Sequence, residues 1–191
     1  MTIKRFLILL LLLIPIALQA QPDKVYKSLD EVSNPEDVYV LKLRWKRLKT
    51  IPPEVFSFVN LRQLDLSNNR IDTIPSDIAN LAHLETLDLS RNALSYLPIE
   101  VGLLGELQDL DLSRNPLVEL PESMAYLPKL QKLTLWSTNI YRLPESFAAL
   151  DVVLRVIDLR SCQLTLTDQE AITALLPSVK RLWDQACNCQ R

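Results

Sequence analysis

Fifteen residues, "LRQLDLSNNRIDTIP" from Leu61 to Pro75, recur along the chain at a constant spacing. The run returns as "LETLDLSRNALSYLP" from Leu84 and as "LQDLDLSRNPLVELP" from Leu107, which gives a period of 23 residues. Weaker copies in the same phase start at Val38, at Leu130 and, after one inserted residue, at Leu154. A fixed period of roughly 20 to 30 residues indicates a solenoid of stacked units, so the repeat constrains the fold before any local motif does.

The spacing of the apolar residues changes along each unit. They fall at positions 1, 4, 6, 11, 14, 18 and 21, as in Leu61, Leu64, Leu66, Ile71, Ile74, Ile78 and Leu81. Positions 4 and 6 share one face of a short strand, and the later spacing of three or four residues predicts a loose helical or 3₁₀ turn. Because no unit can bury its apolar edge alone, neighbouring units must stack and align their strands in parallel.

Two further columns of the repeat predict how the backbone turns. Position 9 is Asn69, Asn92 and Asn115 in the central units, where an amide can satisfy backbone groups that would otherwise be buried without partners. The remaining units carry Lys46, Thr138 and Cys162 there. Position 15 is proline in five units, which suits the start of a backbone stretch outside the sheet. These prolines are Pro52, Pro75, Pro98, Pro121 and Pro144.

The full pattern is L-x-x-L-x-L-x-x-N-x-L followed by x-x-[IL]-P-x-x-[IVMF]-x-x-L, and it resembles the leucine-rich-repeat family in its 23-residue form. The resemblance covers residues 38–164 and is closest in type to small exported bacterial members and to Ras-suppressor-like repeats. It implies an α/β solenoid shaped as a horseshoe, with short parallel strands on the concave face, a helical or irregular convex side and small helical caps. It implies a binding scaffold, with no reaction and no cofactor.

The repeat boundaries predict four segments. Residues 1–20 are expected to be a signal peptide, 21–37 an N-terminal helical cap, 38–166 six leucine-rich repeats, and 167–191 a C-terminal cap with a cysteine-containing tail. Ser28-Leu29-Asp30-Glu31 and Thr167-Asp168-Gln169-Glu170 both match the capping box that begins a helix. The segment "SVKRLW" after Pro177 is expected to add a last edge strand.

The start of the chain predicts export. "MTIKRFLILLLLLIPIALQA" has a basic n-region, an apolar run from Phe6 to Leu18 and small or polar residues up to Ala20, as secretory signal peptides do. The alternative is an uncleaved anchor, but the run is short for the roughly 20 residues that span a bilayer, and Pro15 interrupts it. We therefore expect a periplasmic or extracellular protein, monomeric and with no membrane span after cleavage.

Charge and cysteine content limit the ligands. The formal net charge is −2, and removal of Lys4 and Arg5 would leave about −4, which argues against nucleic acid as the main partner. Cys162 fits a buried position inside a repeat, whereas Cys187 and Cys189 lie in the tail with their pairing open. A Cys-x-Cys pair with one distant histidine, His83, does not make the usual four-ligand zinc site, so no metal is expected.

The candidate binding residues lie on or beside the outward strand positions 3, 5 and 7. Arg44, Trp45, Trp136 and Arg160 depart there from the repeat pattern, and Arg91 and Arg114 stand at the adjacent position 8. Tryptophan and arginine dominate binding hot spots. The alternative is that Trp45 packs on the N-terminal cap and that Trp136 stacks on Arg160. The aspartates at position 5 would repel one another if they stack, and Arg91 and Arg114 are expected to offset that repulsion.

These features predict a non-catalytic, exported recognition module that binds a protein, or alternatively a glycan, on its concave face. Paired carboxylates could in principle act catalytically, but no histidine or nucleophile lies near them in the repeat. Two alternatives remain open: a structural component of the cell envelope, and the substrate-recruiting arm of a separate enzyme.

Overall fold

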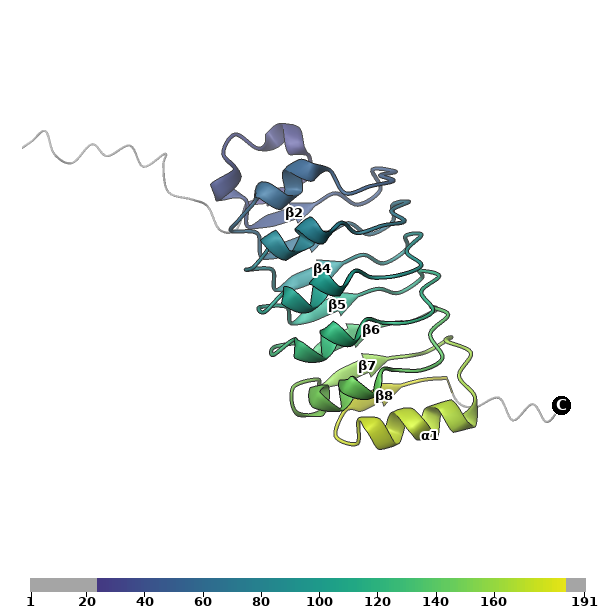
Figure 1. Ribbon diagram of the computed structural model, residues 1–191. Helices are drawn as coiled ribbons and strands as arrows, with labels where there is room; N and C mark the ends of the chain where they lie inside the picture. The colour runs from purple at the N-terminus through teal and green to yellow at the C-terminus, as the bar shows by residue number, and fades with distance from the viewer. Residues whose placement is uncertain (1–23, 185–191) are drawn as a thin grey trace, which may run out of the picture.

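The computed structural model of the protein describes residues 24–184, which form one open sheet of eight parallel strands in chain order (Figure 1). The strands are β1 (Val25–Tyr26), β2 (Val40–Lys42), β3 (Gln63–Asp65), β4 (Thr86–Asp88), β5 (Asp109–Asp111), β6 (Lys132–Thr134), β7 (Val156–Asp158) and β8 (Lys180–Leu182). The α/β solenoid predicted from the repeat is confirmed. The predicted signal peptide, Cys187 and Cys189 lie outside the described residues.

Short 3₁₀ helices form the other side of the coil, one after each strand from β2 to β6 (Figure 1). They are η4 (Pro53–Ser57), η5 (Ser76–Asn80), η6 (Ile99–Leu103), η7 (Glu122–Tyr126) and η8 (Glu145–Val152). Each follows directly on the position-15 proline, whose φ lies between −57° and −73°. A fixed φ in that range suits the residue that leads into a helix, so these prolines set where the chain leaves its extended path.

The core is a continuous stack of leucines between the sheet and the helices. In neighbouring strands, Leu64 pairs with Leu87 and Leu87 pairs with Leu110, so residues of the same repeat position lie side by side. These three side chains are at most 1% exposed. Burying one such side chain stabilises the fold by about 1.5–3 kcal/mol, and the repetition along the array makes this the dominant favourable contribution.

The position-9 asparagines join each unit to the one before it. The Asn69 side-chain amide donates to the Leu43 and Leu66 carbonyl oxygens at 2.9 and 2.8 Å, and its Oδ1 accepts from the Leu48 N–H at 3.1 Å. Asn92 and Asn115 repeat this arrangement one and two units further on. The structural role predicted for this column is confirmed.

The last two units replace the amide with smaller groups. Thr138 Oγ1 donates to the Leu135 carbonyl at 2.8 Å, and the Cys162 Sγ lies 3.0 Å from that same oxygen. Cys162 is buried, as predicted, and it occupies the asparagine column. At the end of the array the Ser161 N–H donates to the Asp184 carboxylate at 2.7 Å, where earlier units use a backbone carbonyl of the next unit.

The caps differ from the prediction in detail. The N-terminal cap contains two 3₁₀ helices, η2 (Leu29–Glu31) and η3 (Pro35–Asp37), and an unpredicted strand, β1, that pairs with β2. The C-terminal helix α1 (Leu166–Leu175) begins earlier than predicted, because the capping box is formed by Thr165 and Asp168. The box assigned to Thr167 is therefore wrong. The last edge strand predicted in "SVKRLW" is confirmed as β8.

Position 8 adopts a left-handed backbone conformation in all six units. The residues are Trp45, Asn68, Arg91, Arg114, Ser137 and Ser161, with φ between 55° and 62°. Non-glycine residues rarely adopt this region, and asparagine tolerates it better than most. Since every unit shares the conformation, the turn of the coil imposes it on whichever side chain stands there.

Candidate functional site

The six candidate residues lie together along one edge of the sheet, at repeat positions 7 and 8, just beyond the carboxyl ends of strands β2 and β4 to β7. We call this set, Arg44, Trp45, Arg91, Arg114, Trp136 and Arg160, the strand-end rim. Five of them are exposed and Trp136 is half-buried. Parallel strands end at the same edge of a sheet, so residues that are up to 116 positions apart in sequence form one surface.

Arg114 and Trp136 are the most closely associated pair of the strand-end rim. The Arg114 guanidinium carbon lies 4.3 Å from the centre of the Trp136 ring. A cation within about 6 Å of a tryptophan face is attracted by the ring quadrupole, worth about 0.5–1 kcal/mol at an exposed site. The cation over the Trp136 ring is therefore Arg114 and not, as the alternative predicts, Arg160.

Arg160 is bound to the aspartate two residues before it. Its Nη2 and Nε lie 2.6 and 3.0 Å from the two carboxylate oxygens of Asp158, which is 7% exposed. Burial alone would raise the pKa of Asp158, but the hydrogen bonds and charge of Arg160 outweigh it and lower that pKa. Arg160 is therefore held in place by the fold and is the least available cation of the strand-end rim.

Arg91 and Arg114 line a shallow groove with Trp45 at its N-terminal end. The hollow has a volume of about 370 Å³ and is lined by Trp45, Asn68, Asn69, Arg91, Asn92 and Arg114. Trp45 is 69% exposed, so the N-terminal cap does not cover it. Sequence reasoning missed Asn68, because asparagine at that position looked like an ordinary turn residue.

The three central residues of the aspartate column beside the strand-end rim all accept backbone N–H groups. Oδ1 of Asp65, Asp88 and Asp111 each accepts the N–H of the serine two residues on, at 2.9–3.0 Å. Arg44 lies 3.6 Å from Asp65, but Arg91 and Arg114 form no ion pair with the described residues. The predicted offset by Arg91 and Arg114 is thus not formed as direct pairs.

Asp88 lies at the centre of this column, between Asp65 and Asp111, and its pKa is raised. Burial raises the pKa of Asp88, and the charges of Asp111 and Asp65 raise it further, while the hydrogen bonds from Ser90 lower it. The middle of the concave face therefore holds negative charge at close spacing, with the arginines of the strand-end rim beyond it.

Comparison with known proteins identifies the family. A leucine-rich-repeat family model matches residues 36–94, and a second matches residues 106–127. The chain is a leucine-rich-repeat protein. No curated protein matches it significantly. Leucine-rich repeats are commonly used for protein binding and are generally recognition modules.

Solved structures of other repeat proteins share the fold. A leucine-rich-repeat protein of Leptospira interrogans is 30% identical with a TM-score of 0.68, and the match covers 85% of this chain and 47% of that one. An internalin of Listeria monocytogenes is 22% identical with a TM-score of 0.65, covering 80% and 44% of the two chains. At that identity the likeness concerns the fold alone. This leucine-rich-repeat protein spans about half the length of either structure.

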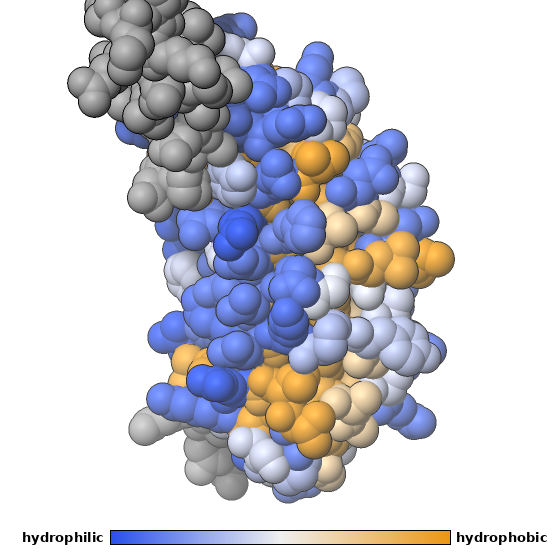
Figure 2. Space-filling view, turned by 90° about the vertical axis from the view of Figure 1, so that its left-hand side faces the viewer, coloured by the Kyte–Doolittle hydropathy of each residue, from blue (hydrophilic) through white to orange (hydrophobic). Residues whose placement is uncertain are grey.

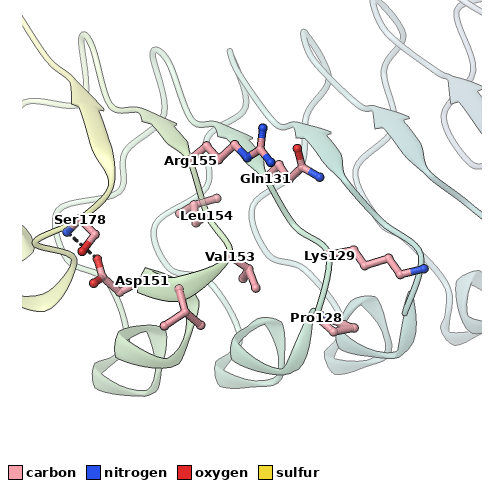
Figure 3. Close-up of a pocket in the computed structure, with 9 residues that line it drawn as sticks. Pro128, Lys129, Gln131, Asp151, Val153, Leu154, Arg155 and Ser178 are labelled. Atoms are coloured by element: carbon pink, nitrogen blue, oxygen red, sulfur yellow. Dashed lines mark hydrogen bonds between the residues drawn. The ribbon is translucent and has the colours of Figure 1, made fainter.

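A larger hollow lies on the opposite edge of the sheet, where the extra residue of the fifth unit is accommodated (Figure 3). It has a volume of about 560 Å³. Asp151 on its wall accepts the Ser178 N–H at 2.8 Å, and Lys129 is paired with Glu106 at 2.5 Å. The hollow has no tryptophan among its lining residues, so we favour the strand-end rim as the site.

The helical side of the repeat protein carries scattered exposed apolar groups. Figure 2 shows hydrophobic patches beside a largely polar surface, one of them near the C-terminal end of the array. The most exposed are Val152 at 88%, Tyr126 at 78%, Ile99 at 68% and Leu103 at 66%. Within residues 24–184 no helix is long and apolar enough to cross a membrane, and no three side chains are grouped as metal ligands.

Proposed function

We propose that this leucine-rich-repeat protein is a non-catalytic recognition module that binds a protein partner along its concave face, with the strand-end rim as the main contact. The observation that carries the proposal is the Arg114–Trp136 pair next to an open groove. Arg114 and Arg91 have no ion-pair partner among the described residues, and Trp136 is only half-buried. Tryptophan and arginine at the centre of an interface are the residue types whose truncation costs most binding energy.

The geometry of the turns supports side-chain recognition at this edge. The N–H of each position-8 residue from Trp45 to Ser137 donates to a backbone carbonyl of the next unit, for example Arg91 to Ser113 at 2.8 Å. Because this row of backbone donors is already used within the coil, a partner must be recognised by the side chains. These side chains stand on a rigid stacked array, which reduces the entropy lost on binding.

We also propose that the protein is exported through the hydrophobic N-terminal segment. Its basic start, its apolar run from Phe6 to Leu18 and its small residues at Ala20 support cleavage and release. Intact mass measurement of the protein recovered from cell fractions tests this, and a mature protein that still begins at Met1 would contradict it.

Affinity capture with matched variants tests the recognition proposal. The full chain and the Arg114→Ala, Trp136→Ala double variant are compared as bait against extracts of the source cell envelope. The control is Arg142→Ala with Tyr141→Ala, which removes a second exposed cation–π pair, 5.5 Å apart, outside the strand-end rim. We expect a partner retained by the wild type and the control and lost by the double variant. The same partner on all three baits would remove the proposed site.

A further inference from the structure

The turns after the first four strands of the repeat array carry a run of cations that extends beyond the strand-end rim. We call this set the basic edge, and it comprises Arg44, Lys46, Arg47, Lys49, Arg70, Arg91 and Arg114. All seven side chains are exposed. The richest part is "RWKRLK", residues 44–49, in which only Trp45 and Leu48 are uncharged.

Most cations of the basic edge form no direct ion pair with the described residues. Only Arg44 has an ion-pair partner among the described residues, Asp65 at 3.6 Å. Positions 8 to 14 of these four units contain two acidic residues, Asp72 and Glu119.

Acidic residues lie in the aspartate column of the strand face and also on the helical side. Each of the helices η4 to η8 has one in its first turn: Glu54, Asp77, Glu100, Glu122 and Glu145. The cations of the basic edge therefore form a positive region beside the aspartate column, on a protein that is mildly acidic overall. A charged region of this kind steers an oppositely charged partner.

We infer that the basic edge binds an acidic, extended polypeptide segment of the partner protein. The inference rests on the proposed function and adds the chemistry of the ligand. Arginine presents a planar fork that matches a carboxylate with two hydrogen bonds. Arg91 and Arg114 stand in adjacent units of one column, so an extended chain that crosses the ends of the strands can bring a carboxylate to each of the two guanidinium groups.

The shallow hollow beside these arginines is also lined by Asn68, Asn69 and Asn92 and by Trp45, whose ring is largely exposed. A ring in that place can cover an apolar or aromatic residue beside the acidic ones.

An anionic lipid surface is the competing ligand for a basic patch with an exposed tryptophan. Stable peripheral binding also uses an apolar face that inserts into the interface. At positions 7 to 14 of the four units that carry the basic edge, the exposed large apolar residues are Trp45, Tyr96 and Val118. They stand in three different units and at three different repeat positions, which makes a poor insertion face.

The test is a binding titration of the full chain with a labelled glutamate oligopeptide. The comparison probes are a glutamine oligopeptide of the same length and vesicles of phosphatidylcholine with and without phosphatidylserine. The variant carries Lys46→Gln, Arg47→Gln, Arg91→Gln and Arg114→Gln. Its control carries Arg155→Gln and Lys180→Gln, two exposed cations at the opposite ends of their strands with no ion pair among the described residues. Thermal melting of each variant verifies that it is folded.

We expect the glutamate peptide to bind the wild type and the control, and to bind the four-site variant roughly tenfold or more weakly, since each exposed ion pair contributes a few-fold. Binding should weaken with added salt. No glutamate binding, equal binding of the glutamine peptide, or unchanged binding by a folded four-site variant overturns the inference. Tighter binding to phosphatidylserine vesicles than to the peptide also overturns it, in favour of a lipid ligand.

The capture experiment keeps the two proposals apart. If the Arg114→Ala, Trp136→Ala variant loses its partner while glutamate does not bind, the acidic-ligand inference fails and the recognition site stands. If glutamate binds the basic edge while capture is unaffected by that variant, the proposed recognition site fails.

Discussion

The central units of the array and its last two units use different residues for the same turn. Asn69, Asn92 and Asn115 each reach two carbonyls in two different units, whereas Thr138 and Cys162 both converge on the single Leu135 carbonyl. The central units therefore hold the coil together through their amides. In the last two units, the tryptophan and arginine that depart from the pattern stand at position 7, which is serine in the centre. The difference separates residues that specify the scaffold from residues available for a ligand.

Replacing Asn115 by alanine should have the largest effect on stability. Asn115 is 2% exposed and contacts the Leu89 and Leu112 carbonyls and the Leu94 N–H. Leaving these groups without partners should lower the free energy of unfolding by about 2–4 kcal/mol. Urea unfolding measures it. Cys162→Ala, the equivalent change at the C-terminal end, should lower the free energy of unfolding by only about 1–2 kcal/mol. Equal losses at the two positions would contradict the view that the central asparagines hold the coil together more strongly than Thr138 and Cys162 do.

On the helical side of the central units, Gly102→Ala should be the next most damaging change. An added Cβ would lie 2.7 Å from the backbone carbonyl carbon of Ser123, whose hydroxyl donates to the Ile99 carbonyl at 2.7 Å. Such overpacking typically costs about 1–3 kcal/mol. Gly105 has no atom within 4 Å of an added Cβ, so Gly105→Ala is the control and should be neutral. A shift in melting temperature for Gly105→Ala but not Gly102→Ala would show that the helices pack differently.

Arg91→Asn should stabilise the fold and weaken ligand binding, as expected for a residue that serves the ligand and not the scaffold. Arg91 has a φ of 55°, the same left-handed conformation that Asn68 adopts in the preceding unit. Because asparagine tolerates this region better, the variant should gain about 0.5–1 kcal/mol in unfolding free energy. The same variant should bind the glutamate peptide more weakly. A loss of stability would mean that Arg91 contributes to the fold.

The smallest expected effect is at Asp88. Its pKa in the folded protein is raised, so the folded state binds the proton more tightly than the unfolded chain and stability falls as the pH rises through that pKa. Asp88→Asn should raise the free energy of unfolding at pH 7 by less than about 1 kcal/mol. The gain should disappear below the ordinary aspartate pKa of about 3.9. Unfolding curves from pH 3 to pH 8 measure this, and a gain that persists at pH 3 would assign it to another cause.

Most of the scaffold could be predicted from sequence because one pattern occurs six times. The strand leucines, the asparagine column and the buried Cys162 follow from period and polarity alone. Strand β1 was missed, since Val25 and Tyr26 are too short a run to show alternation. The second capping box was misplaced because Thr165 and Thr167 both precede an acidic residue by three positions, and only the helix geometry decides between them.

The site could be predicted only as a set of positions. Sequence register places Arg44, Trp45, Arg91, Arg114, Trp136 and Arg160 on one edge, and the structure brings them together there. Which side chain pairs with which depends on rotamers and competing partners. In the structure Arg160 pairs with Asp158, and Arg114 stacks on Trp136. The sequence does not show which of these contacts forms.

The asparagine contacts also give the array a direction. Each amide completes the turn of the preceding unit, as Asn69 does for Leu48, so a unit depends on its successor. Loss of the first unit would leave the turns of the others complete, whereas loss of a late unit would open the turn before it. During synthesis from the N-terminus, each turn therefore stays unfinished until one more repeat has emerged, and shortening the chain should be tolerated better from its beginning than from its end.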